Sequence, residues 1–168
     1  MSGEVQSYLT GTLGLSMLLA LSIGLTVARP RIAREPRIVA RASLVAALAI
    51  AAQLLHFIEE LSTRFYERFP SLLGLEPWGA RFFVAFNVTW LVLWAASVLG
   101  IRAGVVAALV PLWFLGLALA LNAAAHPVLA LRVGGYFPGL FTAPVVGVAG
   151  VVLLGELVRL TRCGWRAA

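Results

Sequence analysis

The chain has 168 residues, of which 61% are hydrophobic and 12% are charged, and its formal net charge is +6. Soluble domains are roughly 45–50% apolar and about 25% charged, and a soluble fold of this size could not bury so much apolar surface. The composition therefore excludes a soluble enzyme, a disordered tail and a disulfide-built secreted domain. It predicts a single all-α domain over residues 1–168, a polytopic membrane bundle of about five transmembrane helices.

Five segments are long and apolar enough to cross a hydrocarbon core, which takes about 20 helical residues. They cover residues 8–28, 38–58, 82–101, 104–126 and 138–157. Pro111 predicts a mild kink in the fourth span, and Pro138 suits the first turn of the fifth. The segment 61–81 is too polar to cross, and its aromatic residues predict a lid lying at the membrane interface.

The basic residues are all arginines, and they flank the apolar segments instead of forming one face, which argues against a nucleic-acid partner. In a five-span topology, nine of them fall on one side and four on the other. The positive-inside rule then places the N-terminus outside and the C-terminus, with the lone Cys163, in the cytoplasm. We expect a bacterial cytoplasmic membrane protein whose partners are membrane lipids.

A stripe of small residues on the fifth span predicts close helix packing, either within the bundle or in a homo-oligomer. Its members are Gly139, Ala143, Gly147 and Gly155.

The second span ends in an unusual group of polar residues that begins at Gln53 and closes with Glu59 and Glu60. His56 precedes Glu59 by three residues and Glu60 by four, so these side chains share neighbouring surface of one helix. Gln53 lies three residues before His56 and extends the same stripe. Because ionisable side chains inside a membrane are costly, they are functional candidates by default.

The third and fourth spans carry polar residues as well. In the fourth span, Asn122 and His126 lie four residues apart on one face, with three alanines between them that allow close helix approach. The third span carries Asn87 near its start, with Trp90 and Trp94 on the same side. We take these residues as candidates for substrate contact or for support of a site.

The predicted topology brings these groups to one membrane depth. The second and fourth spans leave the membrane outward, and the third and fifth spans enter from that side, where Tyr136 and Thr142 begin the fifth. Both histidines, both asparagines and the adjacent glutamate pair therefore converge in the outer half of the bundle. Glu156 lies about 27 Å further along the fifth helix, so we place it near Arg159 at the opposite end.

The order of these motifs resembles the HXXEE-motif family of small integral membrane proteins. The string from His56 to Glu60 has the pattern that names the family, and the Asn122-to-His126 motif and a Tyr-x-Pro-Gly-Leu string at 136–140 follow it. The resemblance runs from the second span to the fifth. It implies a site at these motifs but no reaction, because the family is functionally uncharacterised.

One hypothesis is a metal site in which His56 and His126 supply imidazoles and Glu60 or Glu59 supplies the carboxylate, with Glu60 preferred because it is in register with His56. Three such ligands with an open position suit a catalytic zinc ion, and two histidines with one carboxylate suit iron. The ion would activate water or polarise a carbonyl of a lipophilic substrate. Glu59 could then act as a general base, while Asn87, Asn122 or Tyr136 supports the ligands or contacts the substrate.

Other hypotheses need no metal. Glu59 or Glu60, tuned by His56, could protonate an isoprenoid or another lipid as an isomerase or cyclase does, and Trp90 and Trp94 could stabilise a developing cation. Alternatively, the cluster could serve a small transporter or an ion relay. It could also be a polar network that only holds the helices together.

Overall fold

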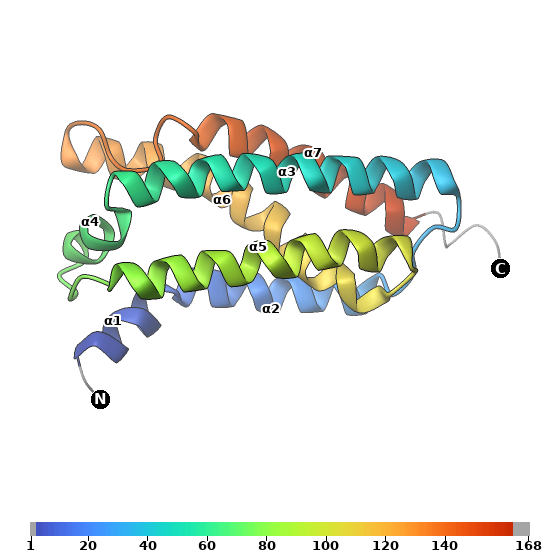
Figure 1. Cartoon of the computed structure of the whole chain (residues 1–168), viewed down its shortest axis with the longest axis horizontal. Coiled ribbons are helices and arrows are strands. Elements are labelled where there is room, and N and C mark those ends of the chain that lie inside the picture. The colour runs from blue at the N-terminus through green and yellow to red at the C-terminus, as the bar shows by residue number, and fades with distance from the viewer. Residues whose placement is uncertain (1–2, 163–168) are drawn as a thin grey trace.

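The structure is a computed structural model that describes residues 3–162 (Figure 1). These residues form helices and no strand, which confirms the all-α prediction. The elements are α1 (Gly3–Gly11), α2 (Leu13–Ala28), α3 (Pro36–Ser62), α4 (Phe65–Leu72), α5 (Ala80–Arg102), the 3-10 helix η1 (Val106–Ala108), α6 (Leu109–Val133) and α7 (Ala143–Arg162). Cys163 and Arg166 lie outside the described residues.

Four of these helical segments are long and apolar enough to cross a membrane, namely α3, α5, η1 with α6, and α7. The α1 and α2 helices make a fifth candidate if they are taken together as one span bent by 51°. Large apolar side chains point outward from the bundle, among them Leu48 on α3 and Val148 on α7. This pattern fits an integral membrane protein, because lipid can cover an apolar surface that water could not.

Helix α6 crosses the bundle and joins its two sides (Figure 1). It packs against α2 and α5 on one side and against α7 on the other, while α3 lies beside α7. The close approach of α6 and α7 depends on small residues: a Cβ added to Gly150 would lie 2.9 Å from the backbone nitrogen of Ala120. A Cβ added to Gly147 would likewise lie 2.5 Å from the Cβ of Ala123. In contrast, no atom lies within 4 Å of the Cβ position of Gly155. The predicted stripe therefore packs α7 against α6 only in part.

The first predicted span, 8–28, is broken at Thr12 in the structure. Packing against the segment before α5 explains the break. The Trp78 indole donates a hydrogen bond to Ser7 Oγ (3.1 Å), and Ser7 Oγ donates to the Glu76 carbonyl (2.6 Å). The same indole lies against Gly11, where no larger side chain would fit. These contacts tie α1 to residues 76–78 and turn it away from the axis of α2.

The fourth and fifth spans have different limits from those predicted. Helix α6 begins at Leu109 and not at residue 104, so Pro111 lies in its first turn, where no backbone N–H is needed, instead of inside a kinked span. It continues past His126 to Val133 and ends at Gly134, whose φ of 70° is the left-handed conformation common after a helix. Helix α7 begins at Ala143 and not near Pro138. Residues 136–142, which lie between the two helices, bind to Glu59 near the end of α3.

The predicted lid segment, 61–81, contains α4, which covers the end of the bundle where α3 finishes and α5 begins (Figure 1). Its Phe65 and Phe69 rings stack with centroids 5.0 Å apart and pack near Trp78. Arg68 of α4 donates to the Tyr136 carbonyl at 3.1 Å, and its guanidinium lies 5.4 Å from the centre of the Phe137 ring. Helix α4 is therefore fastened to the segment that leads into α7.

Candidate metal centre

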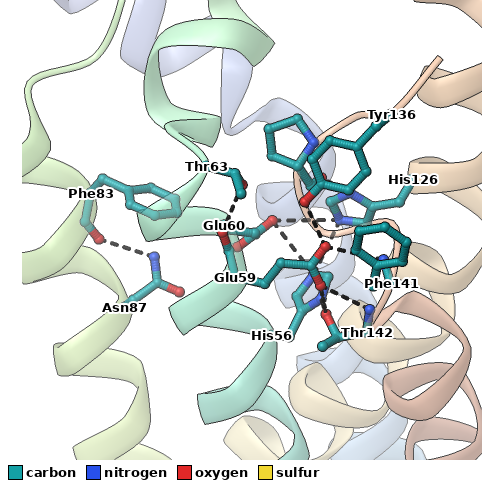
Figure 2. Close-up of polar contacts among 11 residues, drawn as sticks. His56, Glu59, Glu60, Thr63, Phe83, Asn87, His126, Tyr136, Phe141 and Thr142 are labelled. Carbon is teal, nitrogen blue, oxygen red and sulfur yellow. Dashed lines mark hydrogen bonds and ion pairs between the residues drawn. The ribbon is translucent and has the colours of Figure 1, made fainter.

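Three ligand-type side chains meet near the covered end of the bundle (Figure 2). His56 and Glu60 lie one turn apart at the end of α3, and His126 comes from α6. The two Nε2 atoms are 3.1 Å apart, and Glu60 Oε1 lies 3.5 Å from each of them. All three residues are buried, with His56 entirely so.

This spacing is close to that of a metal-ligand set. Zinc bonds to nitrogen and oxygen of about 2.0–2.2 Å place the ligand atoms of a tetrahedral site roughly 3.3–3.6 Å apart. The three distances among His56, Glu60 and His126 are 3.1, 3.5 and 3.5 Å. Two imidazoles and one carboxylate are also ligands that zinc and iron accept. These three side chains could therefore hold a metal ion.

Glu59, the neighbour of Glu60, faces a different partner, the segment before α7. Its carboxylate accepts four hydrogen bonds there: from Tyr136 Oη (2.8 Å), the Phe141 N–H (3.1 Å), the Thr142 N–H (2.8 Å) and Thr142 Oγ1 (2.6 Å). Four donors around one carboxyl group favour its ionised form. Glu59 thus lies beside the cluster of three and anchors residues 136–142 to α3.

Thr142 links this carboxylate to His56. Its hydroxyl hydrogen goes to Glu59, because an ionised carboxylate can only accept a hydrogen bond. Thr142 Oγ1 must then accept from His56 Nδ1, which lies 2.6 Å away. The proton of a neutral His56 is thereby fixed on Nδ1, and its Nε2 carries a lone pair.

His126 is fixed in the same tautomer by a different group. Its Nδ1 lies 2.6 Å from the Pro138 carbonyl, which can only accept, so Nδ1 carries the proton. Two neutral imidazoles would consequently direct bare Nε2 lone pairs at each other across 3.1 Å, beside the Glu60 carboxylate. Such an arrangement calls for a cation at this point, either a metal ion or an added proton. A ligating histidine whose other nitrogen donates to an oxygen is also the usual pattern around metal sites.

Gly139 lets the backbone pass close to both rings. A Cβ at this position would lie 2.6 Å from His126 Nδ1 and 2.9 Å from His56 Cε1. The residue also has φ of +86°, a conformation that other residues rarely adopt. The Pro-Gly pair at 138–139, which we call the glycine cradle, therefore lies closer to the two rings than a residue larger than glycine would allow.

Tyr136 completes the anchor of this segment. Burial, and the hydrogen bond that it donates to Glu59, raise the pKa of the Tyr136 hydroxyl. The sign of this shift means that the phenol keeps its proton, and its donor role, throughout the neutral range. Tyr136 is thus a support for Glu59, and it does not line the cavity described next.

A cavity of about 190 Å³ adjoins the cluster, and Glu60 and His126 form part of its wall. Trp90 and Trp94, which the sequence analysis grouped with Asn87, line it as well. Further aromatic side chains from α4 and α5 enclose it, and the Phe65 ring of α4 lies 5.7 Å from the His126 ring, centre to centre.

The predicted amide residues line this cavity and do not touch the metal-ligand set. Asn87 Nδ2 donates to the Phe83 carbonyl of its own helix at 3.0 Å, apart from the histidines (Figure 2). Asn122 is half-buried in the cavity wall, as is expected from its position one turn before His126. Glu156 lies where the sequence placed it, next to Arg41 (2.9 Å) and Arg159 (3.7 Å).

Sequence reasoning placed Thr142 at the membrane depth of the histidines, but it did not give Pro138, Gly139 or Thr142 a role in orienting them. It assigned them to the first turns of a helix, where the carbonyl of Pro138 would have pointed along the helix axis. The signal that could have revealed them is the Tyr-x-Pro-Gly-Leu string, because a Pro-Gly pair marks a turn more often than a helix start.

The sequence of residues 47–153, which is more than half of the chain, matches the family model described as "protein of unknown function with HXXEE motif". No curated protein and no solved structure matches the chain.

Proposed function

This chain belongs to the family of proteins of unknown function with an HXXEE motif, and we propose that it is a membrane-embedded, metal-dependent enzyme acting on a lipophilic substrate. One observation carries the proposal. Three ligand atoms, from His56, Glu60 and His126, converge close to metal-ligand spacing, and hydrogen bonds to the remaining imidazole nitrogens leave the Nε2 atoms of the neutral imidazoles without a proton. The neighbouring cavity supports a substrate from the membrane, because aromatic and other apolar side chains form most of its wall.

When bound, a divalent ion at this point supplies a Lewis acid that polarises a carbonyl or activates water. The residues of the chain do the rest. Thr142 and the Pro138 carbonyl hold the protons on the two Nδ1 atoms, and Glu59 holds Thr142. Burial of His56, Glu60 and His126 keeps bulk water from the cluster, which strengthens the electrostatic interactions inside it.

The ligand set suits two metals. Two histidines and a carboxylate are the protein ligands of zinc in one class of hydrolases and of non-haem iron in one class of oxygenases. Both ions need at least one position that the protein does not fill, and the three ligand residues here leave room for it on the cavity side, where Glu60 and His126 are exposed to the cavity.

A second candidate function rests on the same 3.1 Å contact. A proton in place of the metal would join the Nε2 atoms of His56 and His126 beside Glu60. The cluster would then be a metal-free acid that protonates a lipid. Removal of metal separates the two functions, because only the metal-free acid survives a chelator.

The experiment measures metal in protein purified from membranes under mild conditions. We expect about one zinc or iron per chain by inductively coupled plasma mass spectrometry, and loss of this metal in Glu60→Gln. The matched control is Glu156→Gln, which changes a buried glutamate at the opposite end and should keep the metal. Wild-type protein without metal, both as isolated and after incubation with Zn²⁺ or Fe²⁺, would contradict the proposal.

The enzymatic part needs a separate measurement. Lipid extracts of cells that express wild-type protein or Glu60→Gln are compared by mass spectrometry. A lipid that is depleted only by the wild type identifies a substrate. Identical lipid profiles, with metal bound, would count against an enzyme of membrane lipids.

A further inference from the structure

The size of the cavity beside the metal centre restricts what can bind there. It measures about 190 Å³. An apolar protein cavity of about 150 Å³ holds one benzene molecule. The cavity therefore has room for one six-membered ring with small substituents, and any longer chain on such a ring has to lie outside it.

Flat aromatic side chains line this space. Trp90 packs against Phe114, with ring centres 4.3 Å apart, and against Trp94 at 5.8 Å. Phe82 and Phe86 continue the same wall along α5, with centres 6.1 Å apart. Stacked and tilted ring faces favour another flat ring over a saturated chain.

The charge of the lining points to an uncharged ligand. No arginine is among the lining residues within the described part of the chain, so an anion would be buried without a partner. Glu60 and His126 are the ionisable groups in the wall. With a metal ion on Glu60, as the proposed function requires, an ammonium group finds no free counter-charge either.

Three carboxamides from three helices give the cavity hydrogen-bonding capacity that the protein does not use. Gln53 of α3 is 6% exposed, lines the cavity and makes no hydrogen bond to any residue that the structure describes. The same holds, among those residues, for the half-buried Asn122 of α6. Asn87 of α5 uses only its Nδ2, in the bond to Phe83. Amide groups that face the cavity without a protein partner can bond to an oxygen atom of a ligand, which would stabilise this layer.

The amides and the metal centre lie at two levels along the helices. Gln53 precedes His56 by three residues, and Asn122 precedes His126 by four. At about 1.5 Å per residue, the two levels are roughly 4.5–6 Å apart along the helix axes. This separation matches a ring that carries one oxygen at each end, one near the metal centre and one near the amides.

We infer that the cavity binds the ring of an uncharged, single-ring oxygenated compound of the phenol, quinol or quinone class. This inference deepens the proposed function and rests on it for the position of the reacting oxygen. The aromatic wall receives the ring, and Gln53, Asn87 and Asn122 receive the oxygen that points away from the metal centre.

The test is calorimetric titration of the metal-loaded, full-length protein in detergent with hydroquinone. We expect one site per chain, and an affinity roughly two- to twelvefold lower in Gln53→Leu, which corresponds to the loss of one hydrogen bond. Toluene, which has the ring without oxygen, should bind both proteins equally. If Gln53→Leu does not fold, Asn122→Leu on the half-buried wall serves instead, with the same expectation.

Control titrations separate the cavity from the micelle and from other ligand classes. Ala118→Phe, which fills the cavity, should remove the binding of both hydroquinone and toluene. Tighter binding of benzoate or benzylammonium than of hydroquinone would overturn the inference, as would unchanged hydroquinone affinity in Gln53→Leu. Metal content is measured on the same samples, so a protein with metal but no hydroquinone site contradicts this inference alone. A protein without metal contradicts the proposed function.

Discussion

His56 and His126 are 70 positions apart in the chain, yet their Nε2 atoms lie 3.1 Å from each other, and their rings meet edge to face. Neither helix fixes this contact alone. Each Nδ1 is held by the segment that precedes α7, through Thr142 for one ring and the Pro138 carbonyl for the other. The segment 136–142 therefore decides which nitrogen of each histidine faces the cluster.

The first prediction concerns the hydroxyl of Thr142. In Thr142→Val, His56 Nδ1 loses its acceptor while the side-chain volume is kept. Because partners of ligating histidines typically contribute 10–100-fold to metal affinity, we expect a loss of that size. Competition between the protein and a chromophoric chelator measures it. Thr142→Ser restores the hydroxyl and should recover most of the affinity; equal affinities for Val and Ser variants would contradict the role given to the hydroxyl.

The second prediction concerns the glycine cradle. Gly139→Ala places a methyl group against both imidazoles and requires an unfavourable φ of +86°. We expect loss of bound metal and a lower thermal midpoint. Gly135→Ala is the matched control, because nothing lies within 4 Å of its Cβ position, and it should keep both properties. Metal analysis and thermal unfolding of the two variants check this; metal retained in Gly139→Ala would show that the rings can move aside.

The third prediction separates the two adjacent glutamates. Glu59→Gln turns an amide NH₂ toward donors of residues 136–142 and removes the charge that they stabilise. Hydrogen bonds to charged groups contribute about 1.5–3 kcal/mol each, so we expect the midpoint of metal-free protein to fall by roughly 5–10 °C. Glu60→Gln should change this midpoint little, because its carboxylate accepts no comparable set of donors. The reverse order of the two midpoints would contradict the anchoring role of Glu59.

The fourth prediction tests the orientation expected from the arginine distribution. Cys163 is the single cysteine, so a membrane-impermeant thiol reagent should label it in inverted vesicles and not in intact cells. Gly135→Cys in a Cys163→Ser background should give the opposite pattern, because Gly135 belongs to the end of the bundle that carries the cluster of His56, Glu60 and His126. Labelling of Cys163 from outside would reverse the assigned orientation.

The helical class and the general position of the site could be predicted because they depend on local signals. Apolar length predicts α3 and α5 within a few residues, and the spacing of His56 and Glu60 already places them on one helix surface. Chain direction then brings His126 to the same end. These inferences need only the helix period and the alternating direction of successive spans. Both can be derived from the order of residues in the chain.

Limits of helices that depend on tertiary contacts could not be predicted. The break at Thr12 depends on Trp78, which is distant in sequence and packs on Gly11. The late start of α7 depends on four hydrogen bonds to Glu59, which hold residues 136–142 outside a helix. In both cases a distant side chain outweighs the local preference of an apolar segment for helix.

The sequence by itself therefore determined an all-helical chain, several apolar spans and the convergence of His56, His126 and the Glu59–Glu60 pair at one end of the bundle, because period, length and charge are local properties. Only the tertiary structure decided that Glu59 accepts hydrogen bonds from the segment 136–142 and that Glu60 lies beside the two histidines. Adjacent residues on a helix point about 100° apart, so they meet different neighbours. Which neighbour each one meets is settled by the packing of α6 and of the turn before α7, and no spacing along α3 contains that information.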